Sequence, residues 1–407
     1  MDSKIETPHF LGTYKNKKDS LIIGLMSGTS LDGVDATLVR IPVGSDDNVS
    51  LLYHYYLPYS HAMRDKISRV CREDTATISD IVDVHFGLST WYAKAVNTLL
   101  EKSGYAPESI DAISMHGQTV WHSPIPKPFP GPDGEFGITG TLQLGNPLVL
   151  RELTHIPVVS DFRSADMAVG GEGAPLAPYS DYMMFGSTEK GRIIQNIGGI
   201  GNATVLPAEN GQRDIFAFDT GPGNMIIDEL VSIYTDNKQL YDDKGEIAKA
   251  GVVNEMIINH CMQDAYFKKR PPKSTGREVY GKDFARTFLA MCTENNLSLV
   301  DAIATATAFT AETICQSYKD FILPFYQISE VLVCGGGALN LTLLKMIGQR
   351  LPEGIEVSTT SAFGIPDQGR EAMAFAIIAH QSLLGKSGNL PQVTGARVPV
   401  ILGTITL

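Results

Sequence analysis

The chain has 407 residues, of which 43% are hydrophobic and 19% are charged, and its formal net charge is -12. This composition is typical of a globular protein long enough for two domains, and the acidic balance argues against a nucleic-acid partner, which needs a basic face. Residues 1–20 mix charged and polar residues and predict a disordered tail, not a signal peptide. No run of about eighteen apolar residues occurs, so no membrane span is predicted. The five cysteines lack Cys-x-x-Cys spacing, which favours a reducing cytoplasm over a zinc site or a disulfide framework.

The first half of the chain predicts a strand, a hairpin turn and a second strand over Leu21–Arg40. Two apolar runs flank the small-residue turn Ser27–Gly33. Further along, apolar residues recur at helical spacing over Ile78–Leu100 and predict a long amphipathic helix. The other elements expected in this half are a strand over Leu51–Leu57, a short strand over Ile110–Ser114, an extended proline- and glycine-rich surface loop over Ser123–Gly140 and an apolar strand over Ile156–Ser160.

The second half repeats this order, because a strand (Arg192–Ile197), a glycine turn and a returning strand (Asn202–Leu206) open it. We therefore expect a duplicated α/β fold whose halves close on a cleft, although the halves share negligible sequence identity. The remaining elements expected here are a strand over Ile215–Phe218, helices over Met225–Tyr234 and Ser298–Lys319, a strand over Glu330–Val333, a helix over Ala338–Leu351, an edge strand over Ile355–Ser358 and a last helix over Arg370–Leu384.

Three glycine-rich turns end strands at distant points of the sequence: Ser27–Gly33, Asp219–Asn224 and Cys334–Gly337. Turn amides bind anions, and a carboxylate beside them is reasonable only if a divalent cation lies between it and the phosphates. Together the turns indicate an ATP cleft between two lobes. The chain lacks a GxxxxGK[ST] motif and a protein-kinase glycine loop, so those mechanisms are disfavoured.

The resulting interpretation is an α/β, two-lobed actin-like or sugar-kinase ATPase fold with a central ATP cleft and ribonuclease-H-like duplicated halves. We expect residues 21–147 with 375–407 to form the first lobe and residues 148–374 to form the second. The last helix is expected to return to the first lobe.

Many segments also resemble the anhydro-N-acetylmuramic acid kinases, in the order of that family and along nearly the whole chain. The matching segments are Gly24–Gly33, His116–Thr119, Gln143–Pro147, Asp161–Arg163, Gly170–Leu176, Asn196–Gly199, Asp219–Asn224, Lys273–Glu278, Cys334–Gly337, Gly364–Pro366 and Val393–Ala396.

The resemblance implies a cytoplasmic enzyme that opens the 1,6-anhydro bridge of anhydro-N-acetylmuramic acid with water and transfers the γ-phosphoryl group of ATP to O6. Because water is a poor nucleophile, a carboxylate must accept its proton, and the family's base matches Asp161. Asp32 and Glu371 match carboxylates near Mg²⁺. The resemblance also favours a homodimer, a small-molecule anhydrosugar substrate, and neither nucleic acid nor membrane as a partner.

The site residues expected from the turns and from the resemblance fall into two sets. The ATP-binding set is Gly28, Thr29, Ser30, Leu31, Asp32, Gly33, Val34, Asp35, Gly198, Gly199, Asp219, Gly221, Gly223, Asn224, Gly335, Gly336 and Gly337. The substrate-binding set is His116, Gln118, Gln143, Asn146 and Arg163.

Alternatives stay open for several of these residues. Asp161 is also suited to capping a helix or pairing with Arg163, and Glu371 to a solvated or capping position. The polar substrate-binding residues are equally suited to holding turns. At the level of function, the alternatives are a kinase for levoglucosan or another anhydrosugar, favoured if the Ser123–Gly140 insert alters substrate choice, and a nucleotide-gated binding protein of the actin or chaperone kind.

Overall fold

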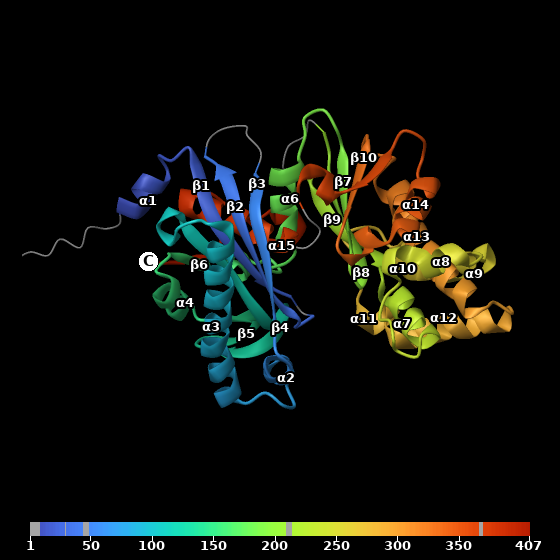
Figure 1. Ribbon diagram of the computed structural model, residues 1–407, viewed down its shortest axis with the longest axis horizontal. Helices are drawn as coiled ribbons and strands as arrows, with labels where there is room; N and C mark the ends of the chain where they lie inside the picture. The colour runs from blue at the N-terminus through green and yellow to red at the C-terminus, as the bar shows by residue number, and fades with distance from the viewer. Residues whose placement is uncertain (1–8, 29, 44–48, 209–213, 366–368) are drawn as a thin grey trace, which may run out of the picture. The chain divides into compact units, whose positions relative to one another are not determined.

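The computed structural model describes residues 9–28, 30–43, 49–208, 214–365 and 369–407. The chain divides into two compact units, Met1–Met184 with Gln368–Leu407, and Phe185–Asp367. Each unit contains one β-sheet with helices packed against it (Figure 1). Within the described residues, none of the helices has the length and apolar character needed to cross a membrane.

The sheet of the first unit has the strand order β12-β6-β4-β1-β2-β3, with β5 paired to β4. Strands β1, β2 and β3 form an antiparallel meander, and β4 and β6 continue the sheet parallel to β1. The strands are β1 (Asp19–Ser27), β2 (Gly33–Pro42), β3 (Ser50–Pro58), β4 (Ala112–Gly131), β5 (Gly134–Leu144), β6 (Val158–Ser160) and β12 (Thr404–Thr406). The helices are α1 (His9–Tyr14), α2 (His61–Val70), α3 (Ile78–Ser103), η1 (Pro107–Ser109), α4 (Pro147–Thr154), α5 (Phe162–Ala168), α6 (Ala177–Phe185), α15 (Arg370–Leu384) and α16 (Pro391–Thr394).

The sheet of the second unit has the order β11-β10-β7-β8-β9. Here too an antiparallel meander (β7, β8, β9) is extended by two strands parallel to its first strand. The strands are β7 (Arg192–Ile197), β8 (Ile200–Leu206), β9 (Phe216–Pro222), β10 (Glu330–Cys334) and β11 (Glu356–Thr359). The helices are α7 (Met225–Tyr234), η3 (Asp243–Gly245), α8 (Glu246–Ala250), α9 (Glu255–Cys261), α10 (Ala265–Lys268), α11 (Arg277–Tyr280), α12 (Lys282–Glu294), α13 (Leu299–Phe321), η4 (Gly336–Leu339), α14 (Leu341–Arg350) and η5 (Thr360–Phe363).

The two sheets therefore share one topology, which confirms the expected duplication: three antiparallel strands followed by two parallel ones. The C-terminal helix α15 packs on the first sheet, as expected. A Cβ atom at Gly24 of β1 would lie 2.0 Å from the carbonyl oxygen of Ala372, so this close approach requires glycine. On the opposite face, Ile23 and Leu25 join a core with Leu88 and other residues of α3.

Three sequence-based expectations differ from the structure. Residues 148–184 belong to the first unit, because β6 pairs with β4, and the whole of α15 lies there as well. Of the expected tail, residues 1–8 lie outside the described part, whereas α1 is helical and Tyr14 is buried, with its hydroxyl hydrogen-bonded to His380 Nδ1.

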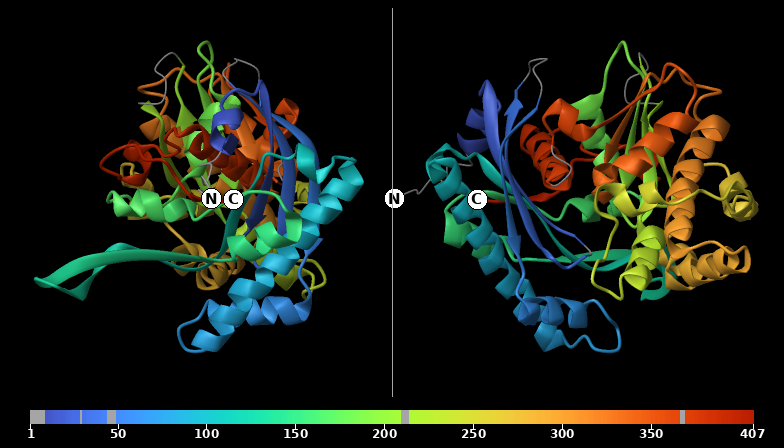
Figure 2. Two further views of the ribbon diagram at one scale, coloured as in Figure 1. Left: turned by 90° about the vertical axis from the view of Figure 1, so that its left-hand side faces the viewer. Right: turned by 45° about the vertical axis from the view of Figure 1, so that its right-hand side comes forward.

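The third difference is the insert 123–140, which is not a loop. It forms the outer part of the β4–β5 ribbon, which projects from the sheet (Figure 2). The prolines at 124, 126, 128 and 130 alternate along β4, so their missing amides share one side of the strand. Beyond the sheet β4 is an edge strand, and proline is tolerated on such a strand at positions that do not donate to the ladder.

Candidate active site

The β1–β2 turn lies at the carboxyl ends of the parallel strands of the first sheet, where ligands of α/β proteins usually bind. Ser30 Oγ donates a hydrogen bond to Asp32 Oδ1 at 2.7 Å, and the Asp32 side chain is exposed. Leu31 has φ 56°, a conformation that costs about 1–3 kcal/mol for a non-glycine residue and occurs most often at functional sites. Gly33 has no room for a side chain, because a Cβ atom would lie 2.4 Å from the carbonyl oxygen of Leu57. The predicted ligand Thr29 lies outside the described residues.

The next residues of β2 have different environments. Val34 is fully buried in the core, so only its backbone is free to contribute to a ligand site. Asp35 Oδ1 lies 2.7 Å from His54 Nε2, a residue of β3. A pocket of about 350 Å³ adjoins the turn and is lined by Ser30, Leu31 and four residues of α2: His61, Arg64, Asp65 and Ser68.

Glu371 lies in the first turn of α15 and belongs to the same unit. Desolvation of the carboxyl group by the surrounding protein raises the pKa of Glu371, whereas the positive charges of Arg370 and Arg163 oppose the rise. Arg370 is itself buried and hydrogen-bonds to the fully buried Asp181. The side chain of Glu371 does not cap the helix, whose N-cap is Gly369.

Asp161 follows β6 directly and has φ 58° and ψ 53°, the left-handed region. It occupies the N-cap position of α5, yet its side chain makes no capping hydrogen bond to the backbone. Oδ1 instead accepts a hydrogen bond from Ser164 Oγ, and the residue is exposed. The side chain of Asp161 therefore does not cap the backbone of α5. It does not pair with Arg163 either, because Arg163 has other partners. A strained, accessible carboxylate at a strand end is typical of a functional position.

Arg163 is held by two protein groups. Its Nε and Nη2 lie 3.1 and 2.9 Å from His116 Nε2, and its Nη1 donates to the carbonyl oxygen of Gly173 at 2.8 Å. Its guanidinium also lies over the ring of Phe375, 5.7 Å from the centroid. Burial lowers the pKa of Arg163, and the nearby Glu371 opposes this.

Three other predicted substrate ligands already have protein partners. Gln118 is fully buried and its Nε2 donates to the carbonyl oxygen of Gly28 at 3.1 Å, so it supports the turn. Asn146 caps α4 through Oδ1, which accepts from the amides of Leu148 and Val149. Gln143 Nε2 donates to Thr141 Oγ1 at 2.7 Å. Contact of these residues with a sugar stays a prediction.

In the second unit the glycine turns converge at the carboxyl end of β7. Asn224 Nδ2 donates to the carbonyl oxygen of Ile197 at 3.1 Å, and the amide of Asn224 donates to that of Gly198 at 2.8 Å. A Cβ atom at Gly223 would lie 2.3 Å from Gly198 O, and one at Gly337 would lie 2.4 Å from the Ile197 side chain. The turns therefore pack backbone against backbone. The predicted nucleotide residues brought together here are Gly198, Gly199, Gly223, Asn224, Gly335, Gly336 and Gly337.

Asp219 and Gly221 lie on β9 of the same unit. Asp219 Oδ2 accepts a hydrogen bond from the amide of Thr275 at 2.9 Å, and burial raises its pKa. A Cβ atom at Gly221 would lie 2.9 Å from the ring of Phe267, and its φ is 140°. Lys273, beside Asp219, is buried with its Nζ 4.7 Å from the ring centroids of both Tyr266 and Phe321.

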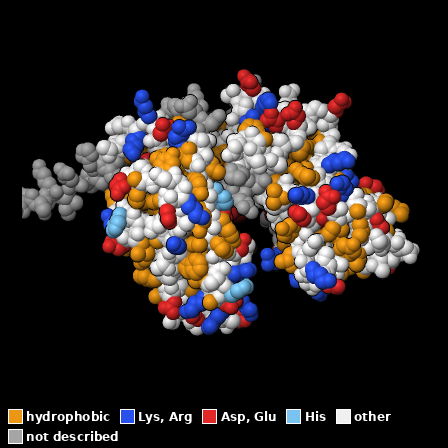
Figure 3. Space-filling model, viewed as in Figure 1, with side chains coloured by type: hydrophobic (Ala, Val, Ile, Leu, Met, Phe, Trp, Pro, Cys, Tyr) orange, Lys and Arg blue, Asp and Glu red, His pale blue; other side chains and the backbone are white. Residues whose placement is uncertain are grey.

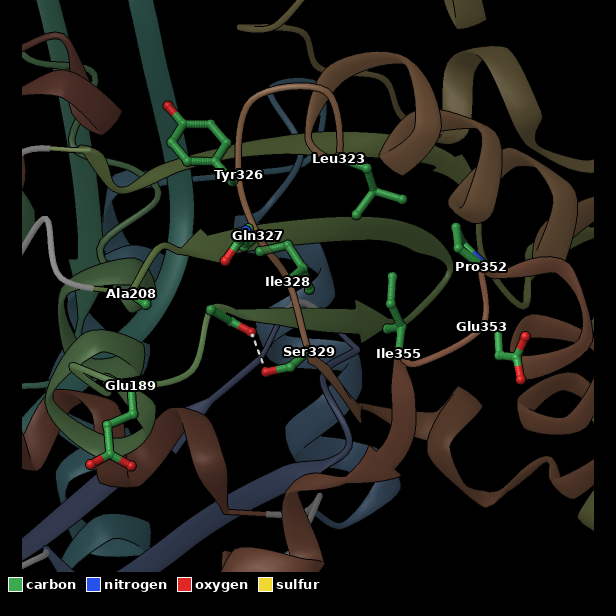
Figure 4. A pocket seen from close by; sticks show the side chains of 11 residues that line it. Glu189, Ala208, Leu323, Tyr326, Gln327, Ile328, Ser329, Pro352, Glu353 and Ile355 are labelled. Carbon is green, nitrogen blue, oxygen red and sulfur yellow. Dashed lines mark hydrogen bonds between the residues drawn. The ribbon is translucent and has the colours of Figure 1, made fainter.

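A larger pocket of about 480 Å³ lies at the other end of the second sheet (Figure 4). Gly191, Ser329 and Ile355 line it, and each of them precedes a parallel strand. It therefore opens at the amino ends of the strands, away from the glycine turns.

Comparison with known proteins decides the family. The family model described as anhydro-N-acetylmuramic acid kinase matches residues 20–407. A relative of that name from Caldanaerobacter subterraneus subsp. tengcongensis is 42% identical over 96% of this chain and 98% of its own length. Another from Bacillus cereus is 40% identical over 95% of this chain and 98% of its own length. The chain belongs to the anhydro-N-acetylmuramic acid kinase family.

Two solved structures are more distant from this family member. The activator of the 2-hydroxyisocaproyl-CoA dehydratase from Clostridium difficile, with bound ADPNP, is 14% identical with a TM-score of 0.44, over 89% of this chain and 95% of its own. A ROK family glucokinase from Streptomyces griseus, in complex with glucose and AMPPNP, is 12% identical with a TM-score of 0.35, over 84% and 94%. Because both TM-scores are low, the fold assignment rests on the repeated strand order within the chain itself.

In this kinase family member, sequence reasoning offered Asp166 only as a partner of Arg163, whereas in the structure Asp166 joins distant segments. It is fully buried, and its Oδ2 accepts the Gly173 amide at 2.9 Å while Oδ1 accepts from Asn389 and Thr394, both at 2.7 Å. It thus ties the C-terminal segment to the loop that holds Arg163. Thr394 lies within the matching segment Val393–Ala396, and Asp166 follows the segment Asp161–Arg163, but only the fold shows that they meet.

Among the residues that the structure describes, no three His, Cys, Asp or Glu side chains form a ready metal site. Mg²⁺ is usually held in proteins by one or two carboxylates together with substrate phosphates and water. The exposed Asp32, hydrogen-bonded through one oxygen only, suits such a position. The cysteines at 261, 292, 315 and 334 are buried, and Cys71 is half-buried.

Proposed function

We propose that this chain hydrolyses the 1,6-anhydro bond of anhydro-N-acetylmuramic acid and phosphorylates O6 with ATP, giving N-acetylmuramic acid 6-phosphate. The observation that carries the proposal is Asp161: an exposed carboxylate in the left-handed conformation, directly after a parallel strand and two residues before the anchored Arg163. Family membership supports the same reaction.

In this mechanism Asp161 acts as the general base, accepting the proton of the water that attacks the anomeric carbon. Its hydrogen bond with Ser164 orients the carboxylate. Arg163 binds the carboxylate of the sugar's lactyl group through N–H groups that the protein leaves open. Gln118 supports the β1–β2 turn through the hydrogen bond that its side chain donates to the carbonyl oxygen of Gly28.

Nucleotide-binding groups are proposed on each unit separately. In the first unit, amides of the β1–β2 turn would hold phosphate oxygens, and Asp32 and Glu371 would hold Mg²⁺. In the second unit, the packed glycine turns are the proposed nucleotide-binding groups. When bound, ATP supplies the phosphoryl group and Mg²⁺ offsets its charge.

We also propose a cytoplasmic homodimer. Ile78, Val82 and Phe86 are 83%, 51% and 50% exposed at successive turns of α3, and Figure 3 shows apolar side chains gathered over that part of the first unit. Exposed apolar surface of this kind is typical of protein interfaces. Sedimentation equilibrium is expected to give twice the chain mass. A Val82→Asp variant is expected to dissociate, and a monomeric unmodified protein would contradict the proposal.

The test of function is an ADP-release assay with anhydro-N-acetylmuramic acid, with the product identified by mass spectrometry. We expect sugar-dependent ADP release and a product heavier than the substrate by one water and one phosphoryl group. The same assay with levoglucosan addresses the alternative, which would be favoured by a higher kcat/KM for that sugar. ADP release that no sugar accelerates would contradict both.

A further inference from the structure

His116 was expected to contact sugar, but the structure places both of its ring nitrogens on protein atoms. Nδ1 lies 2.7 Å from the carbonyl oxygen of Gly117, which can only accept, so Nδ1 carries a proton. Nε2 faces two nitrogens of Arg163 at 2.9 and 3.1 Å, and a guanidinium can only donate. Nε2 is therefore unprotonated, and His116 is the neutral Nδ1–H tautomer.

The surroundings of His116 agree with this protonation state. The residue is 3% exposed, and burial together with the charge of Arg163 lowers the pKa of His116 to about 3. Its ring also packs against Phe375, with centroids 4.4 Å apart. A fully enclosed ring with both nitrogens in use has no group left for a sugar hydroxyl.

Arg163, by contrast, has capacity left. Of its five N–H groups, three are directed at His116 and Gly173, which leaves one on each terminal nitrogen. Among the described residues, no carboxylate lies within ion-pair distance of Arg163, although Glu371 is close enough to influence its pKa. A half-buried cation that forms no direct ion pair favours an anionic ligand.

The frame around Arg163 is rigid. Gly173, whose carbonyl accepts from Arg163, is fixed by Asp166 through its amide at 2.9 Å. Its φ is 71°, and a Cβ atom would lie 2.8 Å from the Met167 side chain. Two independent supports, the His116 ring and the Gly173 carbonyl, thus hold the guanidinium from different sides.

We propose that His116 is a positioning residue that orients Arg163, so that the open N–H groups of the guanidinium meet the lactyl carboxylate and select acidic anhydrosugars. This inference rests on the proposed function, since the substrate must carry that carboxylate. Guanidinium and carboxylate match geometrically as a two-hydrogen-bond pair, which gives selectivity as well as affinity.

The test compares His116→Asn with His116→Gln, because the amide oxygen of Gln can replace Nε2 as an acceptor whereas Asn is too short to reach Arg163. Each variant is assayed with anhydro-N-acetylmuramic acid and with 1,6-anhydro-N-acetylglucosamine, which lacks the lactyl group. His116→Asn is expected to raise the KM for the acidic sugar about tenfold or more, with kcat and the rate for the neutral sugar within about threefold. His116→Gln is expected to retain most of the selectivity. The control His260→Asn, at an exposed histidine of α9 in the second unit, is expected to retain all of it.

Equal losses for both sugars in His116→Asn would overturn the proposal, because direct contact with the ring or general misfolding would not depend on the lactyl group. The Arg163→Lys variant completes a double-mutant cycle: adding His116→Asn to it is expected to cause no further loss of selectivity, and an additive loss would also overturn the proposal.

A measurement that does not depend on enzyme turnover can test this inference separately from the proposed function. Nitrogen-15 NMR of the histidine ring is expected to show His116 as the Nδ1–H tautomer throughout pH 5–8. Titration of His116 near its ordinary value would overturn the positioning role. Lack of turnover with both sugars in the unmodified protein would contradict the proposed function and the lactyl assignment, while the NMR result would still decide how Arg163 is held.

Discussion

The two units repeat one strand order but present different chemistry at the carboxyl ends of their strands. In the first unit these ends carry side chains, including Asp32, Asp161 and the anchored Arg163. In the second unit the corresponding ends are glycine turns packed so closely that Gly223 and Gly337 have no space for a Cβ atom. The comparison indicates that duplication supplied two similar frames, one carrying charged side chains, which we propose act on the substrate, and one presenting a backbone surface.

The strongest test of this contrast removes the proposed base. Asp161→Asn is expected to lower kcat about 10²–10⁴-fold with the nucleotide dissociation constant unchanged, because an amide cannot accept the proton from water. Turnover and nucleotide binding are measured on the same preparation. Near-normal turnover would show that the base is another group. Ser164→Ala, which removes only the orienting hydroxyl, is expected to have a smaller effect.

The backbone surface of the second unit is tested by adding one carbon atom. In Gly223→Ala the new Cβ would lie 2.3 Å from Gly198 O, which is expected to cost about 1–3 kcal/mol of stability and to weaken nucleotide binding. Gly336→Ala is the matched control, because its Cβ would come no closer than 3.5 Å to Asn224 Nδ2. We expect its melting temperature to stay near that of the unmodified protein. A similar loss of stability in both variants would contradict the packing argument.

The carboxylates of the first unit are tested through metal dependence. Asp32→Asn and Glu371→Gln are each expected to raise the Mg²⁺ concentration for half-maximal rate about tenfold, since each removes a charge from the proposed cation position. Asp133→Asn, an exposed residue between β4 and β5, serves as the control. An unchanged Mg²⁺ requirement in Asp32→Asn would remove that residue from the metal site.

The smallest expected effect concerns a charge in the second unit. Burial and the nearby Asp242 raise the pKa of Asp228 from 3.8 to about 7. Below pH 3.8 the group is protonated in both folded and unfolded states and has no effect, whereas above pH 7 it is ionised in both and destabilises the folded state. Its cost therefore grows as the pH rises from 4 to 7.

Asp228→Asn is expected to gain about 1 kcal/mol of unfolding free energy relative to the unmodified protein between pH 4 and pH 8, after allowance for its partial exposure. Denaturant unfolding at several pH values measures this gain. The exposed Asp283→Asn is the control. A gain that shrinks with rising pH would contradict the assignment.

Much of the fold could be predicted from the sequence, because regular periodicity reflects which face of an element is buried. The helix expected over Arg370–Leu384 and the strand over Arg192–Ile197 are confirmed residue for residue. The β4–β5 ribbon could not be predicted from local signals. Prolines are compatible with a strand only when its outer edge is unpaired, and that depends on the whole sheet.

The site was predictable in part for a similar reason. Motif residues identify where functional groups lie, but a side chain's hydrogen-bonding capacity is the same whether a sugar or the protein satisfies it. His116, Gln118 and Asn146 were expected to bind substrate on chemical grounds, yet in the structure they support Arg163, the β1–β2 turn and α4. Only the tertiary structure shows which partner each residue already has.

The most direct test of the account is a crystal structure of the protein with a non-hydrolysable ATP analogue and anhydro-N-acetylmuramic acid. The account predicts a carboxylate oxygen of Asp161 within about 3 Å of a water molecule on the far side of the anomeric carbon from the bridge oxygen. A complex in which a different side chain contacts that water, with Asp161 directed to bulk solvent, would contradict it.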